Sequence, residues 1–138
     1  MSIINKTETF FTTNVLASTN YLYSNAATAV TIQTATSGQV AISGYNKQTI
    51  QVAVNSINAS TTKIWYRVEG RLSNISSWAS LVTASVVSAA ALDDFVVVDK
   101  NMDYMRVGVK RVGTNTLNAT LSPLPTSVTV VGYLEETE

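Results

Sequence analysis

Apolar and polar residues alternate with a period of two along much of this chain. The longest alternating run extends from Ile64 to Leu72, where the even positions are apolar or glycine and the odd positions are Trp65, Arg67, Glu69 and Arg71. Consecutive side chains of a β-strand point to opposite faces of a sheet. The run therefore predicts a strand with one face on a core and the other face toward solvent.

Shorter alternating runs are separated by Ser, Asn, Gly and Asp residues, which favour turns. These runs are Val30–Gln33, Val40–Ile42, Ile50–Val54, Tyr104–Val112 and Val128–Leu134. Between them, Ser80–Leu92 predicts a strand followed by a loop with a short helix. Phe95–Val98 is apolar at every position and predicts a strand buried on both faces.

Many short strands at close and regular spacing are typical of an antiparallel β-sandwich. We predict an all-β, antiparallel, jelly-roll-like sandwich of about eight to ten strands with an extended N-terminal arm. Residues 1–20 form this arm or, alternatively, the first strand, because the Thr-rich sequence around Phe10 and Phe11 favours β-structure. Residues 21–138 form a single domain, since no linker or change of composition divides them.

The composition favours self-association. Charged residues make up 13% of the 138 residues and sum to a net charge of zero, where a typical protein has about 25% charged residues. A chain without net charge gives no electrostatic reason to expect nucleic acid or an anionic membrane as a partner. It also lacks the charge repulsion that keeps proteins apart. We therefore expect a homo-oligomer.

The sequence contains neither cysteine nor histidine. It thus lacks the thiols of disulfides and the side chain that most often acts as general base or metal ligand. We expect no enzyme activity, no metal and no cofactor. The first residues lack the basic and apolar regions of a signal peptide, and no run is long and apolar enough to span a bilayer. Synthesis in the cytoplasm without a cleaved signal is expected.

Asp99, Asn101 and Asp103 have the spacing that begins an EF-hand calcium loop. The sixth position of such a loop requires glycine but is Tyr104, and the twelfth requires glutamate but is Lys110. An EF-hand is excluded. A polar turn between strands is the favoured interpretation, and a looser cation site is the alternative.

Asp93, Asp94, Asp99 and Glu69 carry the carboxyl groups that glycoside hydrolysis would require. Their spacing in the sequence does not bring any two of them face to face. The sequence therefore gives no acid pair on which to base a hydrolase.

Trp65 shares a strand face with Arg67, Glu69 and Arg71, so it is not expected at the centre of the core. Trp65 can instead pack in a contact with the second sheet, in a partner interface or in a ligand groove, and the sequence does not distinguish these three roles. The charged residues of this face can form cross-strand ion pairs with residues of the run Tyr104–Val112, among them Arg106 and Lys110. On an exposed sheet, each such pair contributes about 0–1 kcal/mol.

The stretch Trp65-Tyr66-Arg67-Val68-Glu69-Gly70, followed by Ser73-Asn74 and Trp78, resembles sequence common in β-sandwich proteins of tailed-phage particles. It is also similar to discoidin-like carbohydrate-binding sandwiches, in which a strand runs to a polar loop and a tryptophan folds back on the sheet. Tyr104–Val109 resembles a later strand of such domains. The resemblance covers about residues 62–112. Discoidin domains often have a more acidic, glycine-containing loop than Ser73-Asn74-Ile75, which argues against ligand binding there.

The resemblance implies a non-enzymatic virion structural protein, a capsid decoration or cement protein that bridges capsomers as a homo-oligomer. Its partners would be copies of itself and the major capsid protein or other virion proteins, and its location would be the virion. The alternative is a carbohydrate-binding or host-adhesion module that uses Trp65, Trp78 or nearby tyrosines. The residues expected at the partner interface are Phe10, Phe11, Trp65, Arg67, Glu69 and Arg71.

Overall fold

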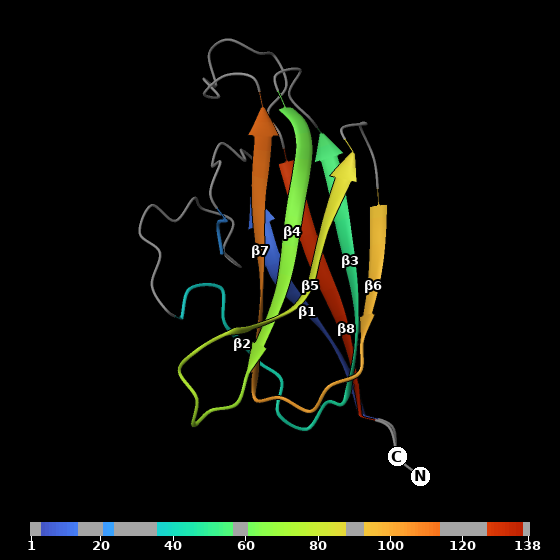
Figure 1. Ribbon diagram of the computed structural model, residues 1–138. Helices are drawn as coiled ribbons and strands as arrows, with labels where there is room; N and C mark the ends of the chain where they lie inside the picture. Colours follow the sequence, from blue (N-terminus) through green and yellow to red (C-terminus); the bar gives the residue numbers. More distant parts are fainter. Residues whose placement is uncertain are drawn as a thin grey trace.

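Figure 1 shows the computed structural model of the chain, which describes residues 4–13, 21–23, 36–56, 61–87, 93–113 and 127–136. These ranges contain eight strands and no helix, and thus no helix that could cross a membrane. The strands are β1 (Ile4–Thr13), β2 (Val40–Ala41), β3 (Lys47–Ser56), β4 (Thr61–Arg71), β5 (Ala79–Val87), β6 (Asp93–Val98), β7 (Tyr104–Gly113) and β8 (Ser127–Glu136).

The strands form two antiparallel sheets of four strands each, packed as a sandwich (Figure 1). Sheet A has the order β1-β8-β3-β6, and sheet B has the order β2-β7-β4-β5. The pairing is nested, because β4 pairs with β5, β3 with β6, β2 with β7 and β1 with β8. This is the order of a jelly roll, in which one long hairpin is rolled into two sheets. The predicted all-β, jelly-roll-like sandwich is confirmed.

Alternate residues of the strands fill a single core between the sheets. From sheet B, Ile64, Tyr66 and Val68 are buried, and from sheet A, Ile50 and Val52 are buried beside them. Burial of one such side chain contributes about 1.5–3 kcal/mol to stability. The even positions of β4 therefore face the core, as the period of its sequence predicts.

A β-bulge in β1 turns two consecutive phenylalanines into the core. The register of β1 against β8 shifts between Thr9 and Phe11. A bulge sets one extra residue against the partner strand and interrupts the alternation of faces. Phe10 and Phe11 consequently have no exposed surface. Ile4–Thr13 forms the first strand of sheet A, which is one of the two interpretations given for the N-terminal segment. Residues 14–20 lie outside the described ranges.

The prediction that Phe95–Val98 is buried on both faces is wrong. Phe95 is 63% exposed and Val97 is 56% exposed, whereas Val98 is buried. The reason is that sheet A is one layer of a two-layer sandwich, so that one face of β6 meets the core and the other points away from it. The outward face of β6 carries the apolar side chains of Phe95 and Val97, which remain largely exposed.

Two further predictions concern residues outside the described ranges. They are the strand Val30–Gln33 and the loop with a short helix after β5. The strand part of Ser80–Leu92 is confirmed, because β5 covers Ala79–Val87.

Gly132 of β8 provides a test of the packing around the bulge. A Cβ atom at this position would overlap ring carbons of Phe10. We expect Gly132→Ala to lower the free energy of unfolding by about 1–3 kcal/mol, as overpacked cores do, measured by chemical denaturation. Combining it with Phe10→Leu, which shortens the opposing side chain, should cost less than the sum of the two single changes. Additive costs would show that the two positions are not in contact.

Candidate functional site: the outer face of sheet B

The outer face of sheet B is formed mainly by the odd positions of β4 and the even positions of β7. The strands pair so that Trp65 lies opposite Lys110, and Glu69 lies opposite Arg106. Directly opposite residues on one face of an antiparallel pair have Cβ atoms about 4.5–5.5 Å apart. Side chains that are distant in the sequence are thus brought into contact in pairs.

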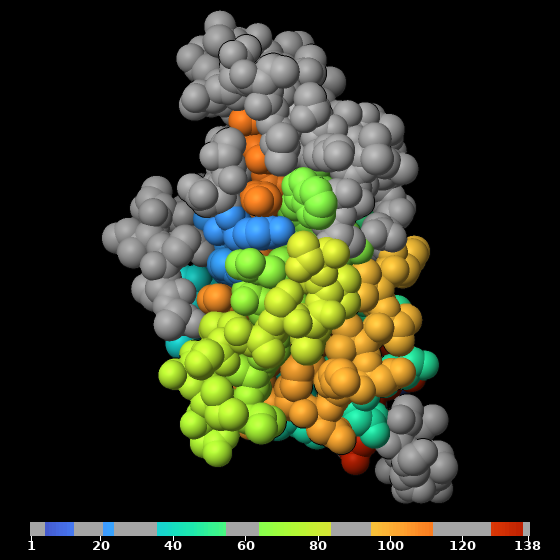
Figure 2. Space-filling model, in the orientation of Figure 1, coloured from blue at the N-terminus to red at the C-terminus, as the bar shows by residue number. Residues whose placement is uncertain are grey.

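Residues 21–23 extend this sheet beyond β7. The N–H of Leu22 donates to the carbonyl of Val109 at 2.9 Å, and the N–H of Val109 donates back to Leu22 at 3.0 Å. Leu22 packs against the core, so Tyr21 and Tyr23 on either side of it turn outward. Figure 2 shows residues 21–23, in blue, against the orange and green atoms of β7 and β4. The Tyr23 ring occupies the space that a Cβ at Gly108 would need.

Cations and aromatic rings stack on one another across this face. Arg67 lies 4.2 Å and Lys110 lies 4.7 Å from the ring centroid of Tyr21. Arg106 lies 3.8 Å from the ring of Tyr23 and 4.4 Å from that of Trp78. Each such contact contributes about 0.5–1 kcal/mol at an exposed site and more when it is desolvated.

Arg71 continues the stack, at 5.2 Å from the ring of Trp78 and 4.5 Å from that of Tyr104. Trp78 follows the β4–β5 loop and folds back onto the outer surface of the sheet rather than into the core. We call the whole set the cation–aromatic face, and its members are Tyr21, Tyr23, Trp65, Arg67, Glu69, Arg71, Trp78, Tyr104, Arg106 and Lys110.

Glu69 is the buried carboxylate at the centre of the face. Its Oε1 accepts a hydrogen bond from Arg106 Nε at 3.2 Å and lies 3.8 Å from Arg67 Nε. A guanidinium nitrogen of Arg67 also donates to the Tyr23 hydroxyl. Burial, together with a hydrogen bond to Glu69, raises the pKa of Tyr23 above its usual value. The predicted cross-strand ion pair between Glu69 and Arg106 is confirmed, in a buried rather than an exposed setting.

The face holds four cations against one carboxylate, which gives it a formal charge of +3 in a chain whose net charge is zero. The sum of charges over the sequence therefore conceals a local excess of positive charge. An anionic group is the kind of ligand that this face can attract.

Asp103 lies beside the face and joins three loops. Its carboxylate accepts hydrogen bonds from the Ser73 N–H at 2.7 Å and from the Ser43 hydroxyl at 2.9 Å. The hydrogen bond from the Ser73 N–H lowers the pKa of Asp103 most, and the hydrogen bond from the Ser43 hydroxyl lowers it further below its usual value. Asp99 and Asn101 line a polar hollow whose described lining does not include Asp103, so the three residues of the candidate cation triplet do not share one hollow. In the described part of the chain, no group of three acidic residues is placed to hold a metal ion.

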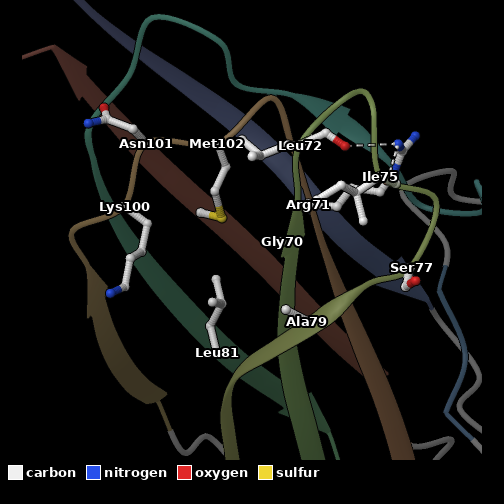
Figure 3. Close-up of a pocket in the computed structure, with 10 residues that line it drawn as sticks. All are labelled: Gly70, Arg71, Leu72, Ile75, Ser77, Ala79, Leu81, Lys100, Asn101 and Met102. Carbon is white, nitrogen blue, oxygen red and sulfur yellow. Dashed lines mark hydrogen bonds between the residues drawn. The ribbon is translucent and has the colours of Figure 1, made fainter.

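An apolar hollow of about 270 Å³ lies between the β4–β5 loop and the β6–β7 connection. Figure 3 shows Met102 and Leu81 pointing into it beside Gly70. Its lining includes the exposed side chains of Leu72 and Ile75. None of its described lining residues is an acid or a nucleophile with an adjacent base, so it offers contact to an apolar group and no chemistry.

The carboxyl groups considered for hydrolysis are separated by the fold. Glu69 is on the outer face of sheet B, whereas Asp93 and Asp94 belong to β6 of sheet A and Asp99 follows that strand. Glu69 therefore belongs to a different sheet from the strand that carries Asp93 and Asp94.

The residues expected at a partner interface divide into two groups. Phe10 and Phe11 are in the core, where no partner can contact them. The other four, Trp65, Arg67, Glu69 and Arg71, share the cation–aromatic face. Sequence reasoning did not place Tyr21 and Tyr23 on this face, because residues so far apart in the chain give no local signal of stacking. The run Tyr21-Leu22-Tyr23 does show two aromatic residues on one side of an extended segment.

No protein-family model matches this chain, and no curated protein matches it either. The chemistry of the face therefore rests on its geometry.

The buried ion pair gives a second prediction. Glu69→Gln would leave Arg106 and Arg67 stacked without a counter-charge, and loss of one partner from such a pair costs about 3 kcal/mol of stability. Chemical denaturation of the variant measures this. Glu8→Gln is the matched control, because Glu8 pairs with the exposed Lys6 and its loss should change stability little. Equal effects of the two changes would contradict a central role for Glu69.

The low pKa of Asp103 predicts a dependence of stability on pH. The folded-state pKa lies below the unfolded value of about 3.9, so the contribution of Asp103 is complete above about pH 4 and is lost as the pH falls through the folded pKa. Asp103→Asn should therefore be less stable than the parent protein at pH 7, with the difference shrinking below about pH 4. Thermal unfolding at several pH values measures this, with the exposed Asp99→Asn as the control. A difference that persists at pH 2 would contradict it.

Proposed function

We propose that this protein is a non-enzymatic structural protein that assembles with copies of itself in a virus particle. As a capsid decoration or cement protein, it would bridge capsomers and stabilise the shell. The observation that carries the proposal is the middle of the outer face of sheet A, which has no charged side chain.

Two rows of side chains cross the outer face of sheet A without a charge. The register of the strands aligns Thr7, Tyr133, Thr49 and Val97 in one row. It aligns Thr9, Val131, Gln51 and Phe95 in the other. Phe95 and Val97 are more than half exposed and Tyr133 is 40% exposed. An apolar, charge-free surface of this kind is typical of protein–protein contact sites.

The edge of sheet A next to this surface is also suited to association. Natural sheets protect their edges with bulges, charges or proline. The opposite edge, β1, has a bulge and carries Lys6 and Glu8. The edge strand β6 pairs with β3 in an unbroken register and, after Asp93 and Asp94 at its start, has only apolar residues from Phe95 to Val98. A second copy is the partner that would bury both the edge and its apolar residues.

The setting in a virion is supported by the resemblance of the central stretch to tailed-phage proteins and by the jelly-roll topology, which recurs in viral capsid and lectin domains. Both are analogies, because one fold serves many functions. The same topology accommodates the second candidate, a carbohydrate-binding or host-adhesion module. Trp65, half-buried on the cation–aromatic face beside Lys110, is the observation that favours it.

Sedimentation tests the assembly. We expect the purified protein to sediment as an oligomer at micromolar concentration and, in native source material, to sediment with particles of virus size in high copy number. Val97→Lys places a charge on the outer face of sheet A and should shift the oligomer toward monomer by at least about tenfold in dissociation constant, because a buried unpaired charge is costly. Ile75→Lys, on the equally exposed β4–β5 loop, is the matched control and should leave the oligomer intact.

Two results would overturn the proposal. One is a protein that remains monomeric at all accessible concentrations. The other is an oligomer that never sediments with particles and does not bind capsids. That result would support self-assembly but contradict the assignment to a virus particle.

A further inference from the structure

Two cations of the cation–aromatic face have no carboxylate of their own. Lys110 has no ion pair within the described residues, and Arg67 shares the Glu69 carboxylate with Arg106, which is closer to it, at 3.2 Å against 3.8 Å. Arg67 Nε is buried without a hydrogen-bond partner in the described part of the chain. This end of the face thus carries positive charge that an anionic group of another molecule can neutralise.

All three arginines of the face donate hydrogen bonds within the chain. Arg106 donates to Glu69, and Arg67 donates to the Tyr23 hydroxyl. Arg71 donates to Gln39 Oε1 at 2.6 Å and to the carbonyl of Ile75 at 3.1 Å. Lys110 and Arg67, which have no carboxylate of their own, both lie over the ring of Tyr21. Two cations suit one oxyanion group rather than a polyanion.

Trp65 adds an aromatic surface to these two cations. It lies directly opposite Lys110 in the β4–β7 pair and two residues from Arg67 on the same face of β4. None of the described cations lies over its ring, whereas Trp78 is covered by Arg71 and Arg106. A half-buried aromatic ring beside a pair of cations fits a ligand that has an apolar face and one carboxylate.

We propose that Lys110, Arg67 and Trp65 bind a carboxylated sugar. The Lys110 ammonium and the Arg67 guanidinium would donate to the sugar carboxylate, and the C–H face of the pyranose ring would pack on Trp65. Charge-assisted hydrogen bonds from a guanidinium to a carboxylate are among the strongest that side chains form. The Tyr21 ring holds both cations in place before the ligand arrives, which reduces the entropy that binding costs.

Other ligands fit the face less well. A single-stranded nucleic acid would need several free cations and open rings for base stacking, and the Tyr21 and Trp78 rings are covered. An acidic peptide gains affinity by pairing its backbone with a free sheet edge. At the edge of β7 beside the site, the backbone groups of Val109 are already hydrogen-bonded to Leu22 and cannot pair with a peptide.

Titration with uronic acid oligosaccharides tests the site. We expect saturable binding, followed by tryptophan fluorescence or calorimetry, that weakens as salt is raised and is at least about tenfold tighter than for neutral glucose oligosaccharides of the same length. Lys110→Gln and Trp65→Ala should each weaken binding at least about tenfold. Lys100→Gln, which removes an exposed cation from the β6–β7 connection, should change affinity less than twofold. Circular dichroism establishes that each variant is folded.

Three results would overturn the inference. They are no binding of uronate oligosaccharides, binding that Lys110→Gln leaves unchanged, and tighter binding of polyglutamate, which would assign the face to an acidic peptide. The inference stands apart from self-association. Val97→Lys should leave sugar binding intact, and Lys110→Gln should leave the oligomer intact, so failure of one proposal is distinguishable from failure of the other.

Discussion

The antiparallel pairing of β4 with β7 is the constraint on which both surfaces of sheet B depend. On the inner surface, it places Tyr66 opposite Val109 and Val68 opposite Val107 in the core. On the outer surface, the same register places Glu69 opposite Arg106. A slip by one residue would turn apolar residues outward and charges inward. Core packing and the cation–aromatic face are therefore fixed together.

Glu69 and the aromatic rings make this density of positive charge compatible with a stable sheet. Four cations close together repel one another, and each loses hydration as it becomes buried. Stacking on Tyr21, Tyr23, Trp78 and Tyr104 provides compensation that does not depend on carboxylates. One glutamate is then enough to offset the repulsion among the cations at the centre of the face. Positive charge is left at the end of the face where Lys110 lies.

The two outer faces of the sandwich differ in their physical character. That of sheet A is uncharged across its middle and ends at β6, with Phe95 and Val97 exposed. That of sheet B is cationic and aromatic. The proposed contact between copies and the proposed recognition of an anionic ligand therefore use opposite sides of the fold. A subunit built in this way can belong to an assembly through one side and present the other to a ligand.

Alternation with a period of two is a local property, and it was enough to predict the class of fold, most of the described strands and the faces of β4. It also identified Trp65, Arg67, Glu69 and Arg71 as members of one face. Only the tertiary structure decided that Phe10 and Phe11 both enter the core, that Phe95 is exposed, and that Tyr21 and Tyr23 stack on cations of β4 and β7. These features arise from a bulge, from the outward direction of one face of sheet A and from contacts between distant segments. Each depends on which strands become neighbours when the hairpin rolls up, and this is set by packing of the whole chain rather than by any local pattern.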